Sequence, residues 1–199
     1  MNKVAAKSVT KSALLEMGMN IMLEKGYSNT GIAEILGALN IPKGSFYHYF
    51  ESKENYAVEI IHSYDERQTA DLIRILRDTE LSPLSRLRAY CEEGKTMLSA
   101  RECRKGCLVG NLSQEMADQS EVLRQELSSV LNKWQDMFIA CIDEGQAVGE
   151  ITKQFPAQAL AELFQAGWTG AMLRAKTVKS THSLDVFITV FVDAMLRAG

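Results

Sequence analysis

The sequence predicts an all-α protein of about nine helices. Its 199 residues are 46% hydrophobic and 24% charged, with only 3 prolines, a composition typical of a globular chain rather than a disordered one. Apolar residues recur at helical intervals of three and four along most of the chain. No stretch alternates apolar and polar residues over a useful length, and no Asn-Gly or Asp-Gly hairpin turn occurs. A sheet is therefore not expected.

End signals delimit the first three helices. A helix over 12–25 is followed by Gly26, a residue favoured just after a helix end. Thr30 is expected to cap the second helix. Asn40 tolerates a left-handed backbone and is expected to end that helix and make the turn. Pro42 suits the start of a very short third helix.

The remaining helices follow from the same kinds of signal. Ser52 is expected to cap a fourth helix that runs to about Asp78. Ser82 followed by Pro83 predicts the start of the next helix, because proline fits the first turn. The periodicity places the later helices at 83–100, 105–117, 120–147, 156–177 and 183–197.

Composition also limits location and partners. The longest apolar run, Met137 to Ile142, has six residues, far below the roughly 20 that span a bilayer. The amino terminus lacks the apolar core of a signal peptide. We expect no membrane partner and a cytoplasmic location, in which the four cysteines stay reduced.

Charge is unevenly distributed along the chain. The first 53 residues carry six lysines and four glutamates, a formal charge of +2, within a net charge of −3. The rest therefore carries −5. A mildly basic front before an acidic body is compatible with nucleic-acid binding, but chance arrangement of solvated faces produces the same asymmetry.

The sharpest signal is in residues 30–50, where two short helices joined by a tight turn predict a helix-turn-helix. Phe46 and Phe50 are four residues apart and are expected to face inward. A small, basic and aromatic set is left to face outward, namely Lys43, Gly44, Ser45, Tyr47 and His48. Such a set suits the major groove of duplex DNA, which admits a helix.

Each predicted DNA contact has a chemical role. Lys43 is expected to donate to guanine, and the small residues after it allow close approach. Tyr47 and His48 are expected to reach phosphate oxygens, as are Lys53 and the hydroxyl of Thr30. Three lysines at the amino terminus add an electrostatic arm: Lys3, Lys7 and Lys11.

Residues 10–60 resemble the amino-terminal DNA-binding domain of the TetR family of repressors. The residues that carry the resemblance, in order and spacing, are Gly26-Tyr27, Thr30-Gly31-Ile32-Ala33, Lys43-Gly44-Ser45-Phe46-Tyr47-His48-Tyr49-Phe50 and Ser52-Lys53-Glu54. Asn40 stands where glycine is common in the family. The resemblance implies a helix-turn-helix domain at 1–51 and a ligand-binding and dimerisation domain at 52–199. It also implies a homodimer on a palindromic operator, released by a small-molecule inducer.

The carboxyl-terminal segments predict a dimer interface. Small residues are frequent in 156–177 and apolar residues in 183–197, so that two helices from each subunit can pack symmetrically. The expected interface residues are Gly167, Gly170, Ala171, Leu184, Phe187, Phe191 and Met195. Packing within a single chain is the alternative explanation.

Cys107 is the candidate sensor. It follows Arg104 and Lys105 near a predicted helix start, and both features lower the pKa of a thiol. The stretch 106–113 resembles the electrophile-sensing branch of the TetR family, in which a cysteine at this place is the candidate reactive thiol. A lysine of that branch near the thiol corresponds to Lys176. A small buried hydrophobe is the alternative role for Cys107.

Other candidates for a ligand pocket are Trp168, Phe164, Tyr64 and Met97, although such residues at helical spacing are more often core. No cofactor or metal is expected, because Cys103 and Cys107 lack the further ligands that zinc requires. Two rival functions remain. A thiol enzyme would need His62 or His182 with an orienting carboxylate, for which the spacing gives no support. An adaptor of the same fold that does not bind DNA would tolerate loss of Lys43 and Tyr47.

Overall fold

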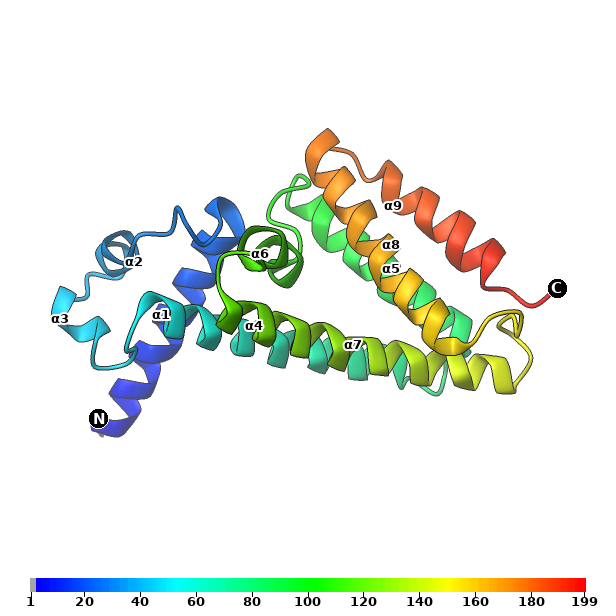
Figure 1. Ribbon diagram of the computed structural model, residues 1–199, viewed down its shortest axis with the longest axis horizontal. Coiled ribbons are helices and arrows are strands. Elements are labelled where there is room, and N and C mark those ends of the chain that lie inside the picture. The colour runs from blue at the N-terminus through cyan, green and yellow to red at the C-terminus, as the bar shows by residue number, and fades with distance from the viewer. Residues whose placement is uncertain (1–2) are drawn as a thin grey trace. The chain divides into compact units, whose positions relative to one another are not determined.

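The computed structural model describes the backbone of residues 3–199 and the side chains of residues 11–199. Within that range the named elements are helices (Figure 1), which confirms the predicted fold class. They are α1 (Lys3–Lys25), α2 (Ile32–Ala38), α3 (Lys43–Phe46), α4 (Lys53–Leu76), α5 (Pro83–Ala100), α6 (Leu108–Met116), α7 (Glu121–Ala147), α8 (Ala157–Val178), α9 (His182–Val186) and the π-helix η1 (Phe187–Met195).

Contacts divide the chain into two compact units. Unit 1 comprises the residues up to Glu66 together with Leu108–Ser128, and unit 2 comprises Arg67–Cys107 and Ser129–Gly199. Unit 1 thus holds α1, α2, α3 and α6, and unit 2 holds α5, α8, α9 and η1. The long helices α4 and α7 each contribute to both. These units are defined by packing, and the functional division between residues 51 and 52 stays a prediction.

The core of unit 1 forms around aromatic side chains of α3, of α4 and of the segment between them. Phe46, Phe50 and Tyr56 are buried against one another. The Tyr56 hydroxyl donates a hydrogen bond to the Leu14 carbonyl of α1. Gly18 permits this contact, because a Cβ there would lie 2.0 Å from the Tyr56 hydroxyl oxygen. The helix pair that follows α1 is therefore anchored from behind.

Most end signals of the sequence are confirmed. Asn40 has φ 54°, and the hydrogen bond from the Ile41 N–H to the Leu36 carbonyl closes a Schellman motif after α2. The Ser52 hydroxyl accepts the Asn55 N–H at 3.0 Å at the start of α4. Ser82 likewise caps α5, with proline following it.

Two predicted helix starts are wrong. Thr30 does not cap α2; its hydroxyl donates to the Gly26 carbonyl at 2.6 Å, and Gly31 takes the N-cap position without a side-chain bond. The sixth helix begins at Leu108 rather than at 105. Lys105 and Gly106 have φ values of 69° and 68°, which a right-handed helix cannot contain.

The first and the last predicted helices also differ from their predicted ranges or helix type. The first helix begins at Lys3 rather than at residue 12. The last predicted helix, 183–197, is observed as a short α-helix followed by a π-helix. The Leu196 N–H bonds to the Phe191 carbonyl, five residues back, a register that a 3.6-residue pattern does not indicate.

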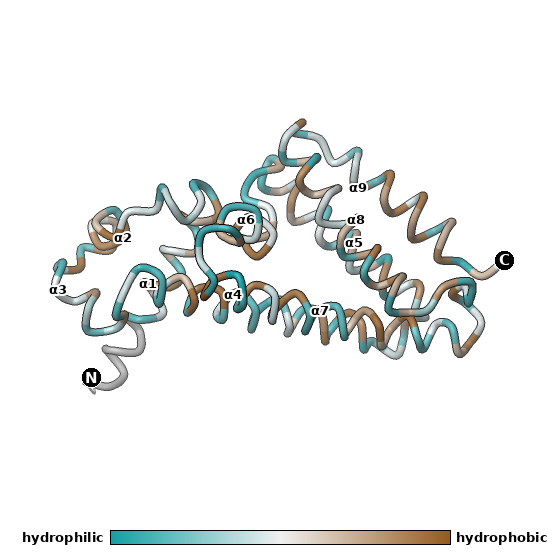
Figure 2. Tube along the Cα trace, viewed as in Figure 1, coloured by the Kyte–Doolittle hydropathy of each residue, from teal (hydrophilic) through white to brown (hydrophobic). Residues whose placement is uncertain are grey.

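The core of unit 2 is an aromatic cluster. The ring of Phe164 lies 4.8 Å from that of Phe138 and 5.5 Å from that of Phe187, centroid to centroid. Trp168 lies 6.1 Å from Tyr90. Figure 2 shows hydrophobic and hydrophilic residues interspersed along α5 and α7, as expected for helices with one buried face.

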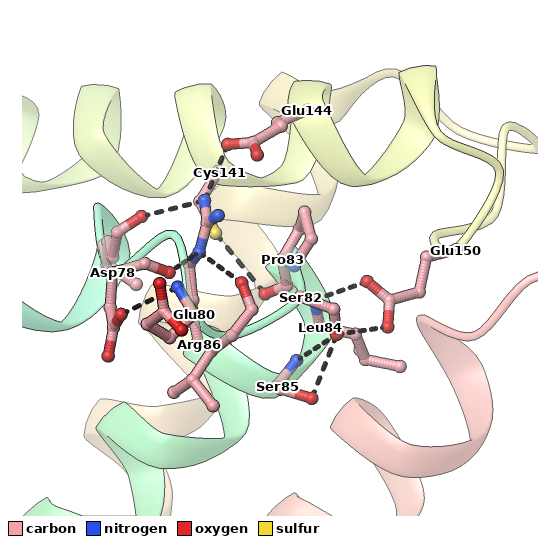
Figure 3. A network of polar contacts seen from close by, with 12 residues as sticks. Asp78, Glu80, Ser82, Pro83, Leu84, Ser85, Arg86, Cys141, Glu144 and Glu150 are labelled. Carbon is pink, nitrogen blue, oxygen red and sulfur yellow. Dashed lines mark hydrogen bonds and ion pairs between the residues drawn. The ribbon is translucent and has the colours of Figure 1, made fainter.

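A buried arginine stabilises the connection between α4 and α5. Arg86 is 5% exposed, and its Nε donates to the carbonyls of Asp78 and Leu81 at 2.6 and 2.9 Å. Its Nη1 pairs with Glu144 of α7 at 2.7 Å (Figure 3). Its charge is thereby paired and its Nε and Nη1 donors are satisfied within the unit, which offsets the cost of burying a guanidinium.

Candidate nucleic-acid interface and thiol site

The outward side of α3 and the turn after it form a small exposed surface in unit 1. Tyr47 is 60% exposed, and Lys43, Gly44 and His48 are also exposed, whereas Ser45 is half-buried. A Cβ added to Gly44 would meet nothing within 4 Å. Close approach of another surface, such as the floor of a DNA groove, is therefore unobstructed here.

The inward side of the same segment holds this surface in place. Phe46 is fully buried, and the Tyr47 ring stands edge-on to it with centroids 5.4 Å apart. Adjacent residues thus have opposite roles, one anchoring and one displayed. The expected inward orientation of Phe46 and Phe50 is what the structure shows.

The predicted phosphate contacts around this surface differ in their availability. Thr30 is 3% exposed and its hydroxyl already donates within the chain. Lys53 donates to the Ser28 carbonyl at 3.3 Å and lies 4.4 Å from the Tyr27 ring centroid. Burial lowers the pKa of Lys53, although the charge of Glu115 opposes that shift. Lys43 is exposed.

The amino-terminal lysines are similarly divided. Lys11 pairs with Glu59 at 3.0 Å and lies 5.7 Å from the ring centroid of Phe50, so its charge is partly engaged within unit 1. The side chains of Lys3 and Lys7 lie outside the described residues. An electrostatic arm at these positions stays a prediction.

One residue near this interface escaped sequence analysis. The Glu115 carboxylate of α6 accepts the backbone N–H of Tyr27 at 2.8 Å and that of Ser28 at 2.7 Å. The partners are 88 and 87 residues apart in the chain. No local pattern identifies such a contact, because it depends on how α6 packs against α1.

Comparison with known families settles the class of the protein. Residues 14–60 match the family described as bacterial regulatory proteins, tetR family, and residues 83–191 match the tetracyclin repressor-like C-terminal domain. The chain belongs to the TetR family. It is a DNA-binding transcriptional regulator, and regulators of this family act as dimers that respond to small molecules.

Individual relatives cover nearly the whole TetR-family chain. It is 39% identical to the transcriptional regulator AcuR of Cereibacter sphaeroides over 184 residues, 92% of this chain and 84% of AcuR. It is 35% identical to the transcriptional repressor DhaR of a Mycobacterium species, over 96% of this chain and 94% of DhaR. The crystal structure of Escherichia coli NemR in its reduced form matches with a TM-score of 0.89 and 27% identity, covering 96% of this chain and 98% of that one.

The four thiols of this TetR-family regulator differ in exposure. Cys91, Cys103 and Cys141 are buried, whereas Cys107 is half-buried. Burial raises the pKa of Cys91 well above its usual range and that of Cys141 to about 12. Because the thiolate is the nucleophile, these two thiols are inert near neutral pH. Cys107 is the cysteine that a reagent in solvent reaches most readily.

The loop before Cys107 has an unusual backbone. Glu102, Cys103 and Lys105 all have positive φ, at 52°, 53° and 69°, a conformation that costs a residue other than glycine about 1 kcal/mol or more. Lys179, which follows α8, donates to the Cys103 carbonyl at 3.2 Å. The loop is therefore held by α8 in a strained conformation next to the candidate thiol.

Tyr90 lies near the thiol and also contacts Trp168. Burial raises the pKa of Tyr90, the charges of Cys107 and Cys91 raise it further, and a hydrogen bond from Trp168 opposes them. Cys107 therefore lies within electrostatic range of the Tyr90 hydroxyl. Lys176, the predicted partner of the thiol, is half-buried on α8, one turn before Lys179.

The predicted pocket residues have different surroundings. Phe164 and Trp168 are buried in the aromatic cluster, Met97 is exposed, and Tyr64 belongs to unit 1 and is half-buried. A half-open cavity of about 450 Å³ lies elsewhere in unit 2. Its lining residues are Leu76, Arg77, Thr79, Arg86, Asp136, Met137, Ala140, Cys141 and Glu144.

The predicted dimer residues fall into three groups. Leu184 and Phe191 are buried within unit 2, which places them in its core rather than on an outer face. Gly167 accommodates Phe187 of the same chain, since a Cβ at Gly167 would lie 2.7 Å from that ring. Ala171 is half-buried, whereas Gly170 and Met195 are exposed. Exposed apolar residues accompany them on the same helices: Leu163, Leu173, Val186 and Val190.

Of the two histidines considered for a thiol enzyme, one has a carboxylate partner in the structure that the sequence spacing did not indicate. His62 pairs with Glu126 at 2.8 Å in unit 1, and His182 is exposed at the start of α9 in unit 2. Among the described residues, no group of three or more His, Cys, Asp and Glu side chains is placed to hold a metal ion. In the same part of the chain, no helix has the length and apolar character needed to cross a membrane.

Proposed function

We propose that this regulator is a homodimeric repressor that binds a palindromic operator through α3 and leaves it when an electrophile alkylates Cys107. The main support for operator binding is that Tyr47 and His48 are exposed to solvent while the adjacent Phe46 is buried and holds the segment in place. Two relatives, DhaR and NemR, are named repressors, which favours repression over activation. A repressor that binds operator DNA acts where that DNA is, so the proposal includes a cytoplasmic location.

In a dimer, operator binding depends on the distance between the two α3 helices. Two α3 helices read half-sites one helical turn apart, about 34 Å centre to centre. If their separation changes, only one of the two helices can contact its half-site. To convert mostly competent dimers into mostly incompetent ones, an inducer needs about 5.5 kcal/mol of preference for the incompetent form. A covalent adduct supplies such a preference through groups that fit the incompetent form better than the competent one.

Exposed apolar side chains of α8 and η1 support the proposed dimer. Leu163 and Leu173 are exposed on α8, and Val190 and Met195 on η1. The backbone at Gly170 is open to close approach, as small residues at helix crossings allow. In a two-fold symmetric dimer, α8 and η1 of one subunit would pack against the same two helices of the other, which makes a four-helix interface.

The exposure of Cys107 supports the proposed chemistry. Its thiolate sulfur bonds to the β-carbon of an α,β-unsaturated carbonyl compound, and the electron pair of the carbon–carbon double bond moves to the α-carbon, which takes a proton from water. No oxidant is required. The loop at residues 102–106 lies next to Cys107 and has a strained backbone, so an adduct on the thiol can shift this loop to a less strained conformation.

The test is fluorescence anisotropy with a duplex that covers the region upstream of the protein's own gene. We expect tight binding of that duplex, much weaker binding of a scrambled duplex of equal length, and release when N-ethylmaleimide is added. Equal binding of the two duplexes would favour the adaptor function. Release of the Cys107→Ser variant by N-ethylmaleimide would rule out Cys107 as the sensor.

A further inference from the structure

The turn between α1 and α2 is held by one carboxylate from another helix. Glu115, in the last turn of α6, accepts the N–H groups of Tyr27 and Ser28 with its two oxygens, at 2.8 and 2.7 Å. The Ser28 hydroxyl adds a further hydrogen bond to the same carboxylate. The donors are mainly backbone groups, so this contact fixes the main chain of the turn directly. Hydrogen bonds to a charged acceptor are stronger than neutral ones.

The turn is shaped to admit this carboxylate. Gly26 has φ 80°, and a Cβ there would lie 2.4 Å from the Glu115 Oε2 atom. Glycine is therefore required at this position both by the left-handed backbone and by the close approach of the carboxylate. Lys53, at the start of α4, donates to the Ser28 carbonyl and its charge attracts Glu115.

Electrostatics show that Glu115 is ionised in this position. Burial alone would raise the pKa of its carboxyl group, but the hydrogen bonds from Ser28 and Tyr27 and the charge of Lys53 outweigh that effect and lower the pKa. The anionic form is the one that accepts both amides. The contact is thus present throughout the neutral pH range.

The held turn leads directly into the DNA-binding helix pair. The Thr30 N–H bonds to the Tyr27 carbonyl at 3.1 Å, and its hydroxyl bonds to the Gly26 carbonyl at 2.6 Å. The next residue, Gly31, is the N-cap of α2. Few free torsions separate the Glu115 contact from α2, which packs against α3. A displacement of the turn therefore displaces the displayed surface.

We propose that Glu115 is a positioning residue for operator binding: by holding the Tyr27–Ser28 backbone it fixes α2 and α3 in the geometry that reads DNA. The assignment rests on the proposed operator binding. The contact lies one residue before the end of α6.

The variant Glu115→Gln tests the proposal, because the expected change in operator affinity is opposite in direction to the change that the loss of a negative charge alone would cause. Removing a negative charge from a protein that binds a polyanion normally strengthens binding or leaves it unchanged. We expect at least tenfold weaker binding of the operator duplex, because the amide retains one acceptor oxygen and presents an N–H₂ group to the other donor. Asp118→Asn, an exposed charge change three residues later, is the matched control and should not weaken binding.

The variant Glu115→Asp distinguishes the effect of side-chain length from the effect of charge. It keeps the anion but is one methylene shorter, so it also should weaken operator binding. If Glu115→Gln or Glu115→Asp binds the duplex as tightly as the unaltered protein, the positioning role is wrong. Failure of the unaltered protein to bind the duplex would instead reject the proposed function.

Amide hydrogen exchange followed by NMR gives a readout that needs no DNA. The Tyr27 and Ser28 amides should exchange slowly in the unaltered protein and at least tenfold faster in Glu115→Gln, while amides in the middle of α4 keep their protection. Unchanged exchange at the two amides overturns the contact. Loss of protection throughout unit 1 would show a general structural role and would overturn the positioning role.

Discussion

Phe46 meets Tyr56 edge-on, with ring centroids 5.1 Å apart and ring planes at 76°. This contact joins α3 to α4, and both rings are fully buried. A helix of four residues has little stability of its own, since helices shorter than about 12 residues are marginal in water. The position of α3 therefore depends on these rings.

The first prediction contrasts two adjacent residues. Phe46→Ala removes a buried ring and should lower the free energy of unfolding by about 3–5 kcal/mol. Tyr47→Ala alters an exposed ring and should leave that free energy within about 0.5 kcal/mol while weakening operator binding. Urea unfolding followed by circular dichroism measures the first effect, and anisotropy the second. Equal destabilisation by the two changes would contradict the assigned orientations.

The second prediction concerns Lys43 and salt. Lys43→Ala should cost about 1–3 kcal/mol of operator affinity and relax the base preference at one position of each half-site. Lys153→Ala, an exposed lysine of unit 2, is the control and should have no effect. The affinity of the unaltered protein should fall with salt, with a slope of about −0.9 per phosphate contact. An affinity independent of salt would argue against the phosphate contacts.

The third prediction concerns the thiols. At neutral pH N-ethylmaleimide should add once to the folded chain, at Cys107, and mass spectrometry of peptides locates the adduct. Cys107→Ser should keep operator affinity and lose the response to the reagent. Cys141→Ser is the control and should respond normally, because the Cys141 thiol is buried with a pKa of about 12. An unchanged response to N-ethylmaleimide in Cys107→Ser would show that the reagent acts at another thiol and would remove Cys107 from the sensing role.

The fourth prediction is a pH dependence of stability. The pKa of Glu115 is lower in the folded state than the ordinary value of 4.5. Its ionised form therefore stabilises the fold fully above that ordinary value, and the contribution is lost as the pH falls through the lowered pKa. The difference in melting temperature between the unaltered protein and Glu115→Gln should be large at pH 7 and shrink toward pH 3. A difference that grows on acidification would have the wrong sign.

The fifth prediction concerns self-association. Val190 is 50% exposed on η1, and Val190→Asp should convert the dimer to a monomer by placing a charge in an apolar contact. Light scattering coupled to size-exclusion chromatography measures the mass. Val148→Asp is the control, since Val148 is 67% exposed after the end of α7 and lies outside the proposed interface. A dimer that persists in Val190→Asp would remove η1 from that interface.

Features that depend on a few neighbouring residues were predictable from the sequence. The left-handed Asn40, the cap at Ser52 and the Ser82–Pro83 helix start are determined by local hydrogen bonds and backbone preferences. The same local reasoning gave the wrong cap for α2. Thr30 had two acceptable partners, and its hydroxyl bonds backward to Gly26 instead of forward into the helix.

Features that depend on distant segments were not predictable. Glu115 shows no local pattern, because its partners are more than 80 residues away. The burial of Leu184 depends on how α9 packs on α8, and that of Phe191 on how η1 packs on α5 and α8. The same apolar periodicity would suit an interface between subunits, so the sequence alone cannot divide these residues between core and interface.

The two long helices α4 and α7 have a consequence for how the molecule melts. Each contributes residues to both compact units. Loss of helix in one unit therefore shortens a helix that also belongs to the other. Calorimetry should accordingly record one heat-absorption peak for the whole chain, and a substitution in the helix-turn-helix should shift that peak rather than split it.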